Sequence, residues 1–80
     1  MTLFFATNQG TTTNLVLKHG TTVGEALKLY LKRVGRPDFI DNIEGKIWFL
    51  YNSRKLEYTD NRKIEDLFRE GEGVIVNDIQ

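Results

Sequence analysis

Residues 46–56, Lys-Ile-Trp-Phe-Leu-Tyr-Asn-Ser-Arg-Lys-Leu (KIWFLYNSRKL), carry the strongest pattern in the chain. Five large apolar residues run from Ile47 to Tyr51 before the Asn52-Ser53 pair breaks the run. Successive side chains of a β-strand point to opposite faces of its sheet. A strand here therefore offers large apolar side chains to both faces, and each face needs either a cover within the domain or a partner.

Composition limits what the rest of the chain can do. Its 80 residues suffice for a single small domain, residues 1–80. One histidine and no cysteine exclude disulfides, thiolate metal sites and histidine-rich metal sites. The net charge is zero without a block of like charges, so nucleic-acid and anionic-membrane binding lack their electrostatic footprint. With no membrane-spanning run or signal peptide, we expect an intracellular protein, cytoplasmic or nuclear, without cofactor or metal.

The first half of the chain predicts a hairpin and a helix. Met1–Ala6 and Thr11–Lys18 flank the polar turn Thr7–Gly10, which is typical of a β-hairpin. Thr22–Glu25 has the pattern of a capping box, and Gly35 with Pro37 just beyond it marks a helix end near Val34. The apolar stripe at helical spacing, which predicts the buried face, consists of Val23, Ala26, Leu27, Tyr30, Leu31 and Val34.

The second half alternates loops and short elements. Arg36–Gly45 is a loop whose apolar residues Phe39, Ile40 and Ile43 we expect to pack on the domain. The quoted strand is followed by a short edge segment at 55–58, one or two helical turns at 63–68, a turn at 71–73 and a last strand at 74–76. This order predicts an α+β fold in which one main helix covers one face of a sheet.

The same order and spacing resemble the ubiquitin-like family. Without a gap, Met1, Phe4, Thr7, Gly10, Thr12, Leu15 and Thr22 stand where ubiquitin carries the same residues. Tyr51–Leu67 (YNSRKLEYTDNRKIEDL) is similar to the family's strand, tight turn, short strand and short helix, with a small insertion near Tyr58–Asn61. The resemblance covers nearly the whole chain. It implies a β-grasp fold: a mixed five-stranded sheet packed on one main helix plus a short second helix, with the first and last strands parallel and central.

Two features depart from ubiquitin. Conjugated members of the family end in Gly-Gly, whereas this sequence ends Asn77-Asp78-Ile79-Gln80. The leucine, isoleucine and valine of ubiquitin's binding patch correspond to Asn8, Leu50 and Asn77. Since two of these three anchors are polar, we expect ordinary ubiquitin receptors to bind poorly.

Strand register decides which side chains the uncovered face presents. If Tyr51 precedes the turn as the family's aromatic residue does, Ile47, Phe49 and Tyr51 point to the helix. The predicted protein-binding patch on the open face then consists of Phe4, Ala6, Trp48, Leu50 and Ile75. Two alternatives stay open. The loop at 36–45 could cover Trp48 as ordinary core, or a one-residue slip could bury Trp48 and Leu50 instead.

Other polar residues have structural explanations at least as good as functional ones. His19 lies beside Gly20 in a turn, and no nucleophile or acid is identified to complete a catalytic site. Glu65, Asp66, Glu70 and Glu72 fit a hydrated acidic surface. The basic pair Arg54-Lys55 comes directly after the turn, where it either steers an acidic partner or keeps the turn hydrated.

These observations favour a monomeric, non-catalytic protein–protein interaction module that docks its partner through the open sheet face. The resemblance implies a partner in the machinery of ubiquitin and protein turnover. The alternative is a covalent ubiquitin-type modifier, if the native chain continues to a Gly-Gly terminus. A Ras-association type domain, which pairs its second strand with a partner strand, would need basic residues along Thr11–Lys18, and only Lys18 is basic there.

Overall fold

The computed structural model describes residues 1–35 and 47–78, so the predicted packing of the 36–45 loop lies outside the described residues. The described elements, in chain order, are β1 (Thr2–Thr7), β2 (Thr12–Val16), α1 (Val23–Arg33), β3 (Ile47–Tyr51), β4 (Arg54–Leu56), α2 (Ile64–Leu67) and β5 (Gly73–Asp78). Every element that the sequence predicted is present, with ends that differ by a few residues. Within these ranges, no helix is long and apolar enough to cross a membrane.

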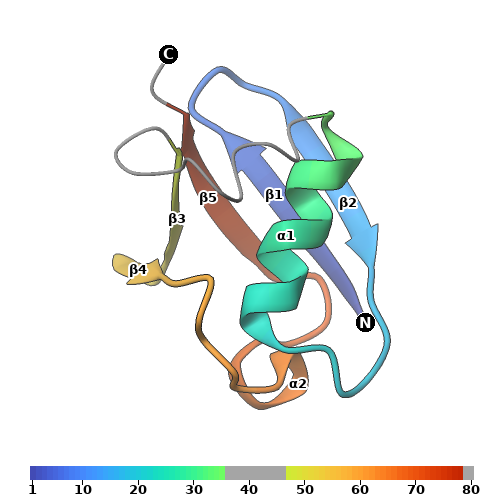
Figure 1. The fold of residues 1–80 in the computed structure, drawn as a ribbon. Helices are drawn as coiled ribbons and strands as arrows, with labels where there is room; N and C mark the ends of the chain where they lie inside the picture. Colours follow the sequence, from blue (N-terminus) through green and yellow to red (C-terminus); the bar gives the residue numbers. More distant parts are fainter. Residues whose placement is uncertain (36–46, 79–80) are drawn as a thin grey trace.

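The five strands form one mixed sheet in the order β2-β1-β5-β3-β4. β1 and β5 pair in parallel inside the sheet, and the other three pairings are antiparallel. α1 lies across one face of this sheet, and α2 lies at one end of it (Figure 1). The expected α+β fold, one main helix and a short second helix on a mixed sheet, is therefore confirmed.

The signals at the ends of α1 act as the sequence predicts. The Thr22 hydroxyl accepts the backbone N–H of Glu25 at 3.2 Å, and the Glu25 carboxylate accepts the backbone N–H of Thr22 at 3.4 Å. Gly35 has a φ of 79°, which suits a residue just past the end of a helix. The prediction that Val34 is buried is wrong: it is 37% exposed because α1 ends at Arg33, one residue before it.

The register of β3 is the one inferred from Tyr51. Ile47 and Phe49 are 4% and 1% exposed and belong to the core, whereas Trp48 is 40% exposed. The one-residue slip is therefore wrong. The turn after β3 has positive φ at both Asn52 (51°) and Ser53 (64°), as a two-residue hairpin turn of type I′ requires.

The loop after β4 holds the beginning of α1. The backbone carbonyls of Arg62 and Asp60 accept the N–H groups of Val23 and Gly24, each at 2.9 Å, so two first-turn donors are satisfied. This approach is so close that a Cβ atom on Gly24 would overlap the Tyr58 carbonyl oxygen. Gly24 is thus required by a backbone contact between α1 and the loop, although glycine disfavours helices.

We predict that Gly24→Ala lowers the free energy of unfolding. Helix propensity alone would give a gain of about 1 kcal/mol, but the overlap with the Tyr58 carbonyl costs about 1–3 kcal/mol or more. Chemical denaturation measures the difference, with Lys28→Ala on the exposed side of α1 as a near-neutral control. A Gly24→Ala protein more stable than the parent would contradict the contact.

Glu65 of α2 holds the turn between β2 and α1. Both of its carboxylate oxygens accept the backbone N–H of Gly20, at 3.1 and 3.0 Å, and the Lys63 ammonium donates to the Gly20 carbonyl at 3.1 Å. Hydrogen bonds from the backbone N–H groups of Glu65 itself and of Gly20, with smaller contributions from the charges of His19 and Lys63, lower the pKa of Glu65 below its ordinary 4.5.

The lowered pKa of Glu65 predicts a pH-dependent contribution to stability. Because the folded state favours the ionised carboxylate, the contribution is fully present above pH 4.5 and is lost as the pH falls through the lower folded-state pKa. Glu65→Gln should therefore be less stable than the parent at neutral pH, with a difference that shrinks below pH 4.5. Thermal unfolding across pH measures this, with Asp66→Asn as the control at the neighbouring exposed carboxylate. A difference in stability between the two proteins that does not change with pH would contradict the role of the ionised Glu65 carboxylate.

Candidate protein-binding surface

The sheet face opposite α1, here called the outer face, carries a row of side chains that runs across four strands. Strand register pairs Ala6 of β1 with Ile75 of β5, Ile75 with Leu50 of β3, and Leu50 with Lys55 of β4. Because partnered residues of adjacent strands point to the same face, these four side chains lie next to one another. None of the described helices covers this face (Figure 1).

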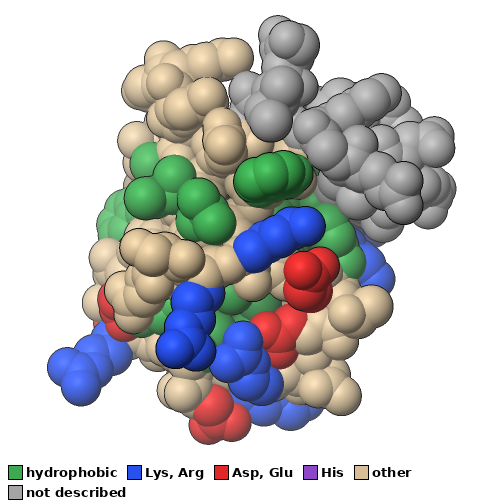
Figure 2. Space-filling view, turned by 90° about the vertical axis from the view of Figure 1, so that its left-hand side faces the viewer, with side chains coloured by type: hydrophobic (Ala, Val, Ile, Leu, Met, Phe, Trp, Pro, Cys, Tyr) green, Lys and Arg blue, Asp and Glu red, His purple; other side chains and the backbone are tan. Residues whose placement is uncertain are grey.

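The structure brings the five predicted patch residues together on this face. Ile75 is 57% exposed and Trp48 40% exposed, and Phe4, Ala6 and Leu50 are half-buried. The alternative in which the 36–45 loop covers Trp48 lies outside the described residues. On the side where β3 and β4 lie, hydrophobic side chains gather beside Lys and Arg side chains (Figure 2). Whether these residues bind a protein stays a prediction.

Two further residues extend the surface beyond the patch predicted from the sequence. The Lys55 ammonium lies 5.4 Å from the centre of the Trp48 ring, a distance at which a cation is attracted to the aromatic face. Val16 on the edge strand β2 is 83% exposed, the most exposed large hydrophobic side chain among the described residues. Period-two alternation through the buried Leu15 and Leu17 would have placed Val16 on the outer face.

The positions of ubiquitin's binding patch also meet in the structure, with a different character. The side-chain amide of Asn8 donates to the Asn77 side-chain oxygen at 3.3 Å. Asn77 in turn is the cross-strand partner of Trp48. The surface beside Trp48 is thus occupied by a hydrogen-bonded amide pair, and its apolar part lies at Leu50 and Ile75.

The ionisable groups near the sheet have structural explanations. The Tyr51 hydroxyl donates to the Glu72 carboxylate at 2.8 Å, and this hydrogen bond raises the pKa of Tyr51. The same carboxylate accepts the backbone N–H of Arg69 at 2.8 Å, and these two bonds lower the pKa of Glu72. His19 is a turn residue as predicted, with an exposed side chain 4.0 Å from the Glu65 carboxylate. The Glu72 carboxylate thus links the end of β3 to the loop before β5.

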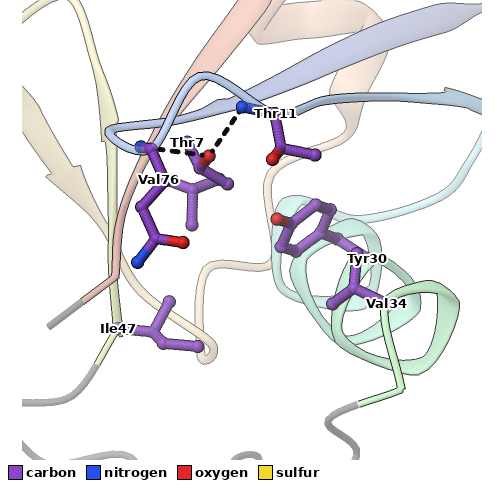
Figure 3. Close-up of a pocket in the computed structure, with 7 residues that line it drawn as sticks. Thr7, Thr11, Tyr30, Val34, Ile47 and Val76 are labelled. Carbon is purple, nitrogen blue, oxygen red and sulfur yellow. Dashed lines mark hydrogen bonds between the residues drawn. The ribbon is translucent and has the colours of Figure 1, made fainter. Parts of the chain in front are cut away.

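A cavity lies between the β1–β2 turn, the end of α1 and the start of β3 (Figure 3). It has a volume of about 150 Å³ and is lined by Thr7, Gln9, Thr11, Tyr30, Val34, Ile47 and Val76. The Thr7 hydroxyl already accepts the backbone N–H groups of Gln9 and Thr11, at 3.3 and 3.0 Å. Sites for small molecules usually occupy about 300–1,000 Å³, so this cavity is a weaker candidate than the outer face.

Comparison with known proteins supports the fold. The chain matches no protein-family model and no curated protein. It is similar to a computationally designed protein based on the template of human erythrocytic ubiquitin, solved by NMR in solution, with a TM-score of 0.70 and 19% sequence identity. The match covers 99% of this chain and 91% of the designed one. The chain has a ubiquitin-like β-grasp fold. At this identity the similarity concerns the fold alone.

Trp48 is the only tryptophan of the chain, so its fluorescence tests the outer face directly. Because the ring is 40% exposed beneath the Lys55 ammonium, we expect efficient quenching by acrylamide and stronger quenching by iodide than by caesium. Lys55→Gln should narrow the difference between iodide and caesium, whereas Lys28→Gln should leave it unchanged. A blue-shifted emission that resists acrylamide would show that Trp48 is buried.

Proposed function

We propose that this protein is a non-catalytic interaction module of ubiquitin-like fold that docks a protein partner through the outer face. The observation that carries the proposal is the row of apolar side chains Ala6, Ile75 and Leu50 at the centre of the sheet. Trp48 lies beside this row, and none of the described helices covers it. Contiguous exposed apolar surface of this kind usually marks an interface. Tryptophan is moreover enriched among the residues that contribute most to binding energy.

Burial elsewhere in the domain supports the choice of this face. The core is built from the inner face of the sheet together with α1, and the described structure buries no polar or charged residue. The large hydrophobic side chains exposed on α1 and at its end are Leu29 and Val34. On the outer face, by contrast, Leu50 is the cross-strand partner of Ile75 and lies two residues from Trp48 along β3. Within the described residues, the outer face therefore brings exposed hydrophobic side chains of neighbouring strands together.

The nature of the partner is inferred from the fold by analogy. Ubiquitin-like domains inside larger proteins commonly recruit components of protein turnover or signalling, so we propose an intracellular partner of that machinery. Fold does not determine function, and the site carries the proposal. Asn8 and Asn77 stand at two of the three ubiquitin patch positions, so the partner we propose recognises Trp48, Leu50 and Ile75 rather than a copy of ubiquitin's own patch.

The test is quantitative affinity purification with the parent protein and two outer-face variants, Trp48→Ala and Ile75→Glu, and then reconstitution with the purified partner. We expect each variant to weaken the reconstituted complex by a factor of about 30 or more, since truncation of a central interface residue costs about 2 kcal/mol or more. Both side chains are at least 40% exposed, so the fold should survive, and circular dichroism verifies this.

Leu29→Glu is the matched control, because it introduces the same charge at a side chain of 43% exposure on α1 rather than on the sheet. The control should retain the partner. Equal loss of binding in Leu29→Glu, or none in the two outer-face variants, would remove the outer face as the docking site.

A further inference from the structure

The spacing of the side chains in the row on the outer face matches the spacing of successive turns of an α-helix. The inference drawn from this match rests on the proposed function. Neighbouring strands lie about 4.8 Å apart, and one turn of an α-helix rises about 5.4 Å. A helix laid across the strands therefore places successive turns over Ala6, Ile75 and Leu50, and its fourth turn over Lys55. We propose that the partner docks an α-helix along this row and places a carboxylate against Lys55.

Aromatic residues lie on both sides of the row along which such a helix would dock. Trp48 stands on one side, two residues from Leu50 along β3, and Phe4 stands on the other, two residues from Ala6 along β1. Gly73, the cross-strand partner of Phe4, has no side chain and leaves backbone there. The small side chain of Ala6 lets the helix approach closely at that end. The row is thus bordered by two aromatic rings, Trp48 beside Leu50 and Phe4 beside Ala6.

Charge complementarity specifies an acidic residue after the apolar part of the helix. Beyond Lys55 a groove of about 460 Å³ is lined by Tyr51, Asn52, Arg54, Lys55, Leu56, Arg62 and Leu67, which include three cations and no carboxylate. Asp60 holds the Arg62 guanidinium, but Arg54 and Lys55 remain exposed. Glu57 lies 3.9 Å from the Lys55 ammonium, an exposed pair that is worth little and yields to a partner.

The same charges argue against a second copy of this chain on the outer face. The outward positions of the described strands include Lys55 but no aspartate or glutamate. In two copies packed face to face, the strands of one copy would offer no carboxylate to the Lys55 side chain of the other. A helix with an acidic residue at this position would instead place a carboxylate beside the Lys55 ammonium. The sequence expected of the docked helix has apolar residues at positions i, i+4 and i+7 and an aspartate or glutamate at i+10 or i+11.

The experiment is selection from a displayed library of 16-residue helical peptides that have leucine, isoleucine or phenylalanine at i, i+4 and i+7 and random residues elsewhere. Panned against the parent protein, the library should become enriched in aspartate or glutamate at i+10 or i+11. Panned against Lys55→Glu, it should become enriched in lysine or arginine there. The best acidic peptide should bind Lys55→Glu about tenfold more weakly or worse than the parent, and Lys28→Glu, the same charge change on α1, unchanged.

The outcomes separate this inference from the proposed function. Selected peptides that lose binding to Ile75→Glu but are indifferent to Lys55→Glu, or that show no acidic preference, overturn the acidic helix and leave the outer face as a docking site. Peptides that bind Ile75→Glu and the parent equally overturn both. A parent protein that enriches no peptide, or that dimerises through the outer face in analytical ultracentrifugation, overturns the acidic helix as well.

Discussion

The packing of Phe49 is the constraint on which the outer face depends. Its ring makes edge contacts with Phe5 of β1, Tyr30 of α1 and Tyr58 after β4, at centroid distances of 6.3, 5.8 and 5.8 Å. Phe5 and Tyr30 also stack on each other at 4.6 Å. Because side chains alternate between the two faces along β3, the burial of Phe49 on the inner face places Trp48 and Leu50 on the outer face. The same packing that stabilises the core thereby exposes the tryptophan.

The parallel pairing of β1 with β5 converts this local orientation into a surface. It places residues from the beginning and the end of the chain side by side, so that Ala6 meets Ile75, and β3 then pairs with the other edge of β5. An antiparallel hairpin alone could not bring these segments together. The apolar row is consequently a property of the tertiary topology, although each of its side chains is placed by simple alternation within a strand.

How much of this could be predicted from the sequence depends on the range of the interactions involved. The capping box of α1 and the orientation of β3 arise from local patterns, and both are confirmed. The requirement for Gly24 could not be foreseen, because it arises from contact with a loop more than thirty residues away in the chain. Val16 could have been found from the alternation of β2. The position of Lys55 over Trp48 needed the exact turn geometry of Asn52 and Ser53.

The polar replacements at ubiquitin's patch positions acquire a physical meaning in this setting. An isolated asparagine among apolar side chains would have to lose water without compensation. Asn8 and Asn77 instead bond to each other at 3.3 Å, so the amides occupy the surface beside Trp48 with part of their hydrogen bonding satisfied. Their presence makes the surface beside Trp48 hydrophilic, while Ile75 and Leu50 carry the apolar character at the middle of the sheet and Lys55 carries the cationic character on β4. Two asparagines therefore displace the apolar surface toward β4 without any change in fold, and a ligand suited to ubiquitin's patch would have to bury these amides in order to bind here.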